Sequence, residues 1–113
     1  MAKDQAITRN LADAQESAAY ERRILADLQP VLYRLYTEYN SNLSMLVSRY
    51  FAGATIYTAQ GLWQHASEVS AVIDILGNRT DLQAITHLAG DIKHRNEQSS
   101  VLVTWATVSR LDV

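Results

Sequence analysis

The sequence predicts an α+β fold, in which a long N-terminal helix precedes a β-β-α-β unit with a small three-stranded sheet. Three observations predict it. Apolar residues recur at helical spacing over residues 1–40, residues 49–113 hold all four glycines and most of the β-branched residues, and one capped helical segment interrupts the strand-like runs. Because 113 residues is the usual size of one domain, we expect a single domain over 1–113, with a helical arm at 1–40 and the β-β-α-β unit at 49–113.

The N-terminal arm carries a heptad stripe. Its apolar residues recur at alternating steps of four and three, and only Glu21 and Asn42 interrupt them. The stripe comprises Ile7, Leu11, Ala14, Ala18, Leu25, Leu28, Leu32, Leu35, Tyr39 and Leu46. Pro30 has no N–H to give to a helix interior, yet the stripe keeps its phase on both sides of it. The sequence therefore predicts either one helix kinked at Pro30 or two helices split there.

Two strand-like runs follow the arm. Residues 49–60 alternate weakly between apolar and polar side chains, and residues 69–75 alternate more clearly. Gly61 lies between the two runs, and Gly77-Asn78 ends the second. We expect the two runs to pair as a hairpin across the loop around Gly61.

A helix and a last strand complete the unit. Thr80 and Gln83 fit a capping box, which predicts a helix that Thr80 caps and that ends near Arg95 or Asn96. Residues 101–106 then alternate as a strand, with Trp105 expected in the core. The helix is long enough for a right-handed crossover, which would set the last strand parallel to a neighbour. The open edges of this small sheet, together with the heptad stripe, predict a homo-oligomer.

Composition narrows the classes of function. The chain has no cysteine, which rules out disulfides, thiolate metal sites and cysteine nucleophiles. The formal net charge is −2 and the pI is about 5.8, which disfavours binding to duplex nucleic acid. The start lacks an apolar signal region, and no apolar run approaches the ~18 residues of a membrane span. We therefore expect a soluble, cytoplasmic protein that does not bind a membrane.

Motifs of known catalytic chemistry are missing. The sequence lacks the Gly-x-Ser-x-Gly nucleophile elbow, the phosphate-binding loop and the dinucleotide fingerprint, so we expect neither an enzyme nor a cofactor. His87, Asp91 and His94 share one side of the predicted helix, and two imidazoles with a carboxylate can bind a divalent metal. That side is also the polar side of the helix, so a solvated face accounts for the same residues. A metal-dependent hydrolase stays open as an alternative.

Several side chains suit a small anionic ligand. The run Gly61-Leu62-Trp63-Gln64 sets an aromatic ring beside a glycine, which fits either stacking on a base or capping of the hairpin core. Arg79, Arg95 and Arg110 could bind phosphates through their guanidinium forks. The basic residues at 93–95 also suit the negative end of a helix dipole, so helix capping explains them as well.

Three stretches of the second half resemble small proteins of phages and prophages. These stretches are Gly61–Gln64, Glu68–Ile75 and Asn96–Val103, within residues 50–108, about half of the chain. In those proteins a Gly-aromatic pair precedes an acidic-Ser-apolar strand, and a capped helix leads through an Asn/Gln-rich turn into Val-Leu-Val. The pattern is also similar to the first-described Thoeris anti-defence family. Members of that family are oligomeric, non-enzymatic phage proteins that sequester cyclic ADP-ribose signals and, in some cases, cyclic oligonucleotides.

This resemblance implies an anti-defence protein in the cytoplasm of the host cell that sequesters a small nucleotide immune signal at a protomer interface, without chemistry. The ligand contacts we infer on that basis are Arg79, Arg95 or Arg110 for the phosphates, Asn96 and Gln98 for the base or ribose, and Trp63 or Tyr57 for stacking. The alternative is a protein-binding inhibitor or assembly module, which would dock through the N-terminal helix or an open strand edge.

Overall fold

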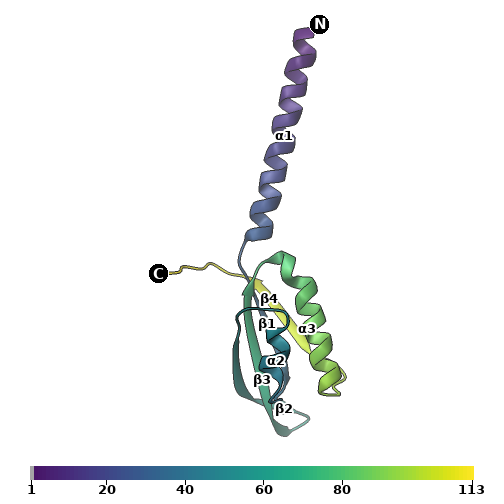
Figure 1. Cartoon of the computed structure of the whole chain (residues 1–113), viewed down its shortest axis with the longest axis vertical. Helices are drawn as coiled ribbons and strands as arrows, with labels where there is room; N and C mark the ends of the chain where they lie inside the picture. The colour runs from purple at the N-terminus through teal and green to yellow at the C-terminus, as the bar shows by residue number, and fades with distance from the viewer. Residues whose placement is uncertain (1) are drawn as a thin grey trace.

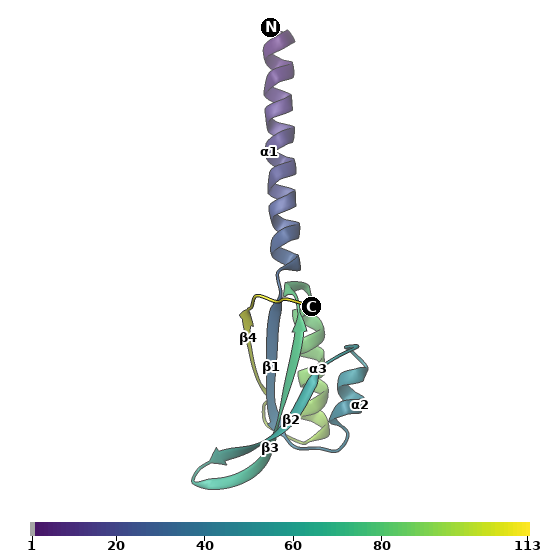
Figure 2. The ribbon, with the colours of Figure 1, turned by 90° about the vertical axis from the view of Figure 1, so that its left-hand side faces the viewer.

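The computed structural model describes residues 2–113, and the side chains of residues 10–113. Its elements are α1 (Ala2–Leu28), β1 (Val31–Glu38), α2 (Leu43–Ser48), β2 (Thr55–Trp63), β3 (Ala66–Gly77), the 3-10 turn η1 (Arg79–Asp81), α3 (Leu82–Arg95) and β4 (Leu102–Thr107). The strands form one sheet, and α2 and α3 lie on one side of it (Figure 1). We call the sheet with these two helices the body. α1 projects from the body along the direction of the strands, as the view turned by 90° also shows (Figure 2).

The predicted α+β class is confirmed, and the sheet has one strand more than expected. Residues 31–38, which we predicted as part of the helical arm, form the strand β1, so the expectation of a kinked or split helix through residue 40 is wrong. The helix ends at Leu28 because a residue that precedes proline, here Gln29, disfavours helical backbone. Beyond Pro30, residues 31–38 are rich in β-branched and aromatic residues, and their burial alternates with period two, as is typical of a strand with one covered face.

The order of strands in the sheet is β2-β3-β1-β4, and every neighbouring pair is antiparallel. The predicted hairpin between the 49–60 and 69–75 runs is present as β2 and β3. The last strand, β4, is antiparallel to its neighbour β1, which corrects the expected parallel pairing. The crossover through α3 does connect two parallel strands, but β1 lies between them. The result is the β-α-β-β-α-β arrangement of ferredoxin-like folds.

The core lies between the sheet and the two helices that cover it. Successive side chains of a strand point to opposite faces, so alternate residues of β1 and β3 enter this core. The largest fully buried side chains are Tyr33, Leu35, Leu43, Ile73, Ile75, Ile85, Leu88 and Ile92. Trp105 pairs with Tyr33 and points to the same side, but it lies on the edge strand and 58% of it is exposed. Our expectation of a core position for Trp105 is therefore wrong.

A tight turn joins β2 to β3. The turn consists of Gln64 and His65, and both residues have positive φ, 48° and 67°. Two successive residues with positive φ are typical of the type I′ turn, whose twist matches that of the strands. Gly61 lies within β2 rather than in the loop, and a side chain there would collide with the Ser70 hydroxyl on the neighbouring strand.

The start of α3 is capped two residues earlier than the sequence suggested. The N-cap is Asn78 and not Thr80. Asn78 Oδ1 accepts a hydrogen bond from the Thr80 N–H at 2.9 Å, and Asp81 Oδ2 accepts one from the Asn78 N–H at the same distance. This reciprocal capping box closes η1, and α3 continues from it without a break. The helix ends at Arg95, as expected.

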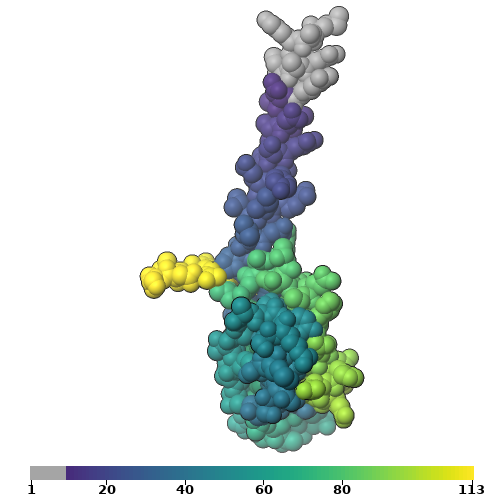
Figure 3. Space-filling model, in the orientation of Figure 1, coloured from purple at the N-terminus to yellow at the C-terminus, as the bar shows by residue number. Residues whose placement is uncertain are grey.

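α1 stands clear of the body for most of its length (Figure 3). At its C-terminal end, Asp27 accepts a hydrogen bond from Arg79 Nε at 2.9 Å, which links the helix to η1. None of the helices within residues 2–113 has a stretch that is both long and apolar enough to cross a lipid bilayer.

Truncation of a core residue tests this packing. Leu35 of β1 is fully buried beneath the helices, so Leu35→Ala should lower the free energy of unfolding by about 2–5 kcal/mol, measured by urea denaturation. Leu111→Ala is the matched control, because Leu111 is exposed in the C-terminal segment and its truncation should change stability by less than about 0.5 kcal/mol. Equal effects of the two substitutions would contradict the place of β1 in the core.

Candidate functional site

The seven predicted ligand contacts do not converge on one site within a protomer. Arg79 lies at the α1 end of the sheet, whereas α3 carries the polypeptide to the opposite end (Figure 1). The seven residues occupy four places: Arg79 in η1, Arg95 with Asn96 and Gln98 at the end of α3, Trp63 at the end of β2, and Tyr57 with Arg110 on the side of the sheet that α2 and α3 leave uncovered. A single nucleotide could contact all four places only if several protomers contributed.

Two of the three candidate arginines are paired within the chain. Arg79 binds Asp27 through its Nε and Nη2 atoms. Arg110 donates from Nε and Nη2 to the carboxylate of Asp112, each at 3.1 Å. Arg95 is exposed at the end of α3. A phosphate would have to displace a carboxylate from Arg79 or from Arg110 before it could use the same donors.

Asn96 and Gln98 belong to a polar cluster that ties the end of α3 to the end of β1. The Thr37 hydroxyl donates to Gln98 Oε1 at 2.5 Å, and Asn96 Nδ2 lies 2.8 Å from the same oxygen. Asn40 Nδ2 donates to Asn96 Oδ1 at 2.6 Å. Among residues 10–113, Thr37 is the one polar residue classed as buried, and this cluster gives its hydroxyl hydrogen-bond partners. Sequence reasoning missed Thr37 and Asn40 because it placed both in a helical arm.

The two candidate stacking residues are exposed. Trp63 ends β2 beside the Gln64-His65 turn, and 70% of it is accessible to solvent. This position does not cap the core of the hairpin, so that alternative for Trp63 is wrong. Tyr57 lies on the uncovered face of the sheet, opposite Val72 of β3. Its hydroxyl is 3.5 Å from Asp74 Oδ2.

An ion pair that the sequence did not reveal lies at the centre of the uncovered face. Arg34 of β1 donates from Nε to Asp74 Oδ1 at 2.7 Å and from Nη2 to Asp74 Oδ2 at 3.0 Å. The two residues are direct cross-strand partners. The hydrogen bonds to Asp74, and then one to Tyr36, raise the pKa of the Arg34 guanidinium above its ordinary value, so it stays charged. The period-two pattern of residues 31–38 was the signal that could have located Arg34 on this face.

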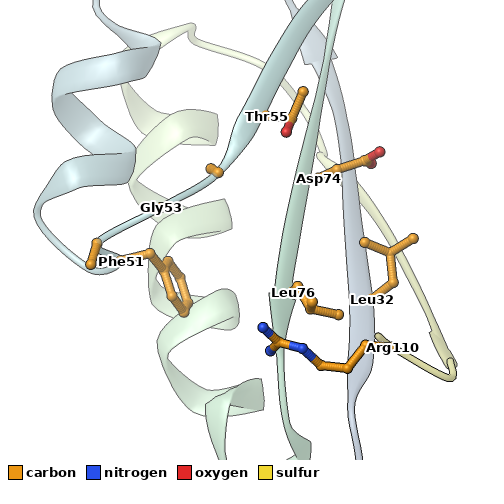
Figure 4. Close-up of a pocket in the computed structure, with 9 residues that line it drawn as sticks. Leu32, Phe51, Gly53, Thr55, Asp74, Leu76 and Arg110 are labelled. Atoms are coloured by element: carbon orange, nitrogen blue, oxygen red, sulfur yellow. The ribbon is translucent and has the colours of Figure 1, made fainter. Parts of the chain in front are cut away.

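An open cavity of about 600 Å³ lies over one end of this face (Figure 4). Leu32 and Leu76 form part of its wall from the sheet, the 51–55 segment forms another, and Arg110 extends along its edge. Its volume falls within the usual range of small-molecule sites. One cationic and one anionic side chain, Arg110 and Asp74, reach the lining.

The residues of the metal hypothesis do not form a metal site. Among the side chains that the structure describes, no group of three or more His, Asp or Glu could hold a metal ion. Asp91 instead accepts a hydrogen bond from the Tyr50 hydroxyl, which joins α3 to the segment after α2. This hydrogen bond, together with partial burial, raises the pKa of Tyr50 above its ordinary value, because both favour the neutral phenol. His87 and His94 are exposed on the polar side of the helix.

The comparisons with known proteins bear on the fold alone. No family model matches the chain, and no curated protein matches it. The crystal structure of a DUF3240 family protein from Shewanella baltica OS155 is similar, with a TM-score of 0.59 over 75% of this chain and 96% of that chain. The two sequences are 9% identical. At that identity, the likeness shows that the two proteins share a fold.

Substitution of Asn96 separates a structural role from a ligand-binding one. Asn96→Ala would leave Thr37, Asn40 and Gln98 with fewer partners, so we expect the free energy of unfolding to fall by about 1–3 kcal/mol in urea denaturation without any ligand. Arg95→Ala, at the neighbouring exposed position, should change it by less than about 0.5 kcal/mol. An Asn96→Ala protein as stable as wild type would show that the cluster does not hold α3 to β1.

Proposed function

We propose that this chain is a non-enzymatic assembly module that binds another helix through the apolar stripe of α1. Within the described side chains, that stripe consists of Leu11, Ala14, Ala18, Leu25 and Leu28, with Glu21 as its one polar position. The observation that carries the proposal is the exposure of this stripe on a helix that projects from the body. Leu11, Leu25 and Leu28 are each more than 60% accessible to solvent.

Two physical arguments support a partner for α1. An isolated helix is marginally stable in water, and most helical stability in proteins comes from packing of an apolar face. The stripe of α1 follows the heptad spacing by which helices pair in coiled coils. A helix held away from its own domain, with such a stripe exposed, fits a protein that acts by association.

Two charges in the stripe should weaken this association. Leu25→Glu combined with Leu28→Glu would bury two carboxylates in the contact, and we expect the affinity to fall at least about tenfold. The measurement is the mass of the complexes by size-exclusion chromatography with light scattering, for the purified protein alone and after incubation with a cell extract.

Tyr20→Glu serves as the control for this experiment. Tyr20 is exposed to a similar degree, but it lies about 130° around the helix from the stripe. We expect the Tyr20→Glu protein to form the same complexes as wild type. If the stripe variant forms the same complexes as well, α1 is not the docking element.

Sequestration of a small nucleotide signal is the second candidate function. It is favoured by the 600 Å³ cavity on the uncovered face, with Arg110 at its edge. Arginine binds phosphate through two parallel hydrogen bonds, and Tyr57 lies on the same face of the sheet. The phage origin and the anti-defence role rest on the resemblance of residues 50–108 described above.

A thermal-shift panel tests this candidate. Cyclic ADP-ribose isomers and cyclic oligonucleotides should raise the Tm, because a ligand of the native state stabilises it by about 2.7 kcal/mol at a hundred times its Kd. Arg110→Gln should remove the shift and leave the Tm of the free protein unchanged, since Arg110 pairs with Asp112 alone in the exposed C-terminal segment. No shift with any member of the panel would exclude sequestration of these signals.

A further inference from the structure

The face of the sheet that α2 and α3 leave uncovered has an ordered pattern of side chains. Cross-strand pairing arranges it in three rows. The tyrosine row contains Tyr57, Val72, Tyr36 and Leu102; the charged row contains Thr55, Asp74, Arg34 and Thr104; and the leucine row contains Leu76, Leu32 and Ala106. Two apolar rows therefore flank one row with an ion pair at its centre. Tyr36, Tyr57, Leu76 and Leu102 are all exposed.

The apolar stripe of α1 points to the same side as this face. Asp27 contacts Arg79, and Ala26 lines a cavity with Val31, Tyr33 and Trp105, which belong to the helix-covered side of the sheet. Successive residues of a helix are rotated by about 100° around its axis. The centre of the stripe therefore lies about 150–170° around α1 from the mean direction of Ala26 and Asp27, on nearly the opposite side of the helix. The stripe and the uncovered face therefore point to the same side of the molecule, one after the other along its long axis, and Arg110 lies over the sheet near their junction.

We infer that the stripe and the uncovered face are covered by a second copy of the chain, in a dimer whose two-fold axis runs parallel to the strands between β1 and β3. The inference rests on the proposed function, in which α1 is a docking helix, and it names the partner. Sheets that pack face to face lie about 10 Å apart, and paired helices lie about 8–10 Å apart. Because these two spacings agree, one two-fold axis can relate both the two sheets and the two α1 helices.

Charge complementarity selects the direction of the axis. With the axis parallel to the strands, β1 of one copy faces β3 of the other, so Arg34 faces Asp74 of the second copy and Leu32 faces its Leu76. With an axis in the same plane but perpendicular to the strands, β1 faces β1 and β3 faces β3. Arg34 would then face Arg34, and Asp74 would face Asp74, which is repulsive.

The same axis also pairs the two α1 helices. Only Gln29 and Pro30 separate α1 from β1, and the helix continues along the direction of the strands (Figures 1 and 2). An axis parallel to the strands therefore places both helices side by side and parallel, with their stripes in contact. An axis perpendicular to the strands would send the two helices to opposite ends of the dimer.

A distance between spin labels on α1 distinguishes these arrangements. The chain has no cysteine, so Tyr20→Cys gives one labelling site, outside the stripe. In the parallel dimer we expect a distance of about 20–35 Å between the labels by pulsed electron paramagnetic resonance. A dimer with the perpendicular axis would give about 60 Å. That distance, or a monomer at about 100 μM, would overturn the inference.

A charge-exchange experiment tests the sheet contact independently. Arg34→Asp and Asp74→Arg chains each lose complementarity with themselves, but a mixture of the two restores every pair between copies. We expect native mass spectrometry of the mixture to show a ratio of heterodimer to either homodimer of at least about 20:1, ten times the statistical ratio of 2:1. The double variant Arg34→Asp/Asp74→Arg should dimerise with itself like wild type. A statistical mixture would overturn the inference.

The two proposals can fail separately. If the chain is monomeric and yet captures another protein in a manner that depends on the stripe, the dimer is excluded and the docking role of α1 stands. If the stripe variant changes neither the dimer nor any other complex, the proposed function fails.

Discussion

The position of β1 at the centre of the sheet is the constraint on which the rest of the structure depends. β1 pairs with β3 on one side and with β4 on the other, so it brings together both halves of the β-α-β-β-α-β arrangement. Its alternate residues supply Tyr33 and Leu35 to the core and Arg34 to the uncovered face. Because α1 joins β1 through Gln29 and Pro30, this strand also sets the direction in which α1 leaves the body.

The sequence was sufficient for the fold class, for the β2–β3 hairpin and for the span of α3, because each has a local signal. β1 was missed because two periods overlap in it. Leu32 and Leu35 happen to continue the heptad of α1, whereas the alternation of Val31, Tyr33 and Leu35 fits a strand equally well. A helical period and a strand period cannot be separated in eight residues without the pairing of β1 with β3 and β4, which comes from distant parts of the chain.

The residues of the candidate site also depend on contacts with distant parts of the chain, which the sequence does not reveal. Residue type suggested that Asn96 and Gln98 would bind a ligand, but their amides form hydrogen bonds with Thr37 and Asn40, about sixty positions earlier. The sequence indicates that Arg79, Arg95 and Arg110 could bind phosphate, but Arg79 and Arg110 pair with carboxylates of the same chain. A polar side chain at the end of a helix has many possible partners, and only the tertiary structure decides among them. The part of the heptad stripe that lies in α1, in contrast, follows from the pattern of apolar residues.

The link between α1 and the body has a mechanical consequence. Beyond Leu28 the backbone passes through Gln29 and Pro30, and the one ion pair that ties the helix to η1 joins two partly exposed side chains, Arg79 and Asp27. Exposed ion pairs contribute little and weaken in salt, since the screening length is about 8 Å at physiological ionic strength. The direction of α1 relative to the strands therefore depends in part on an ion pair that salt weakens. We expect concentrated salt to weaken this contact, so that an association that fixes the direction of α1 carries a larger entropic cost there than in dilute buffer.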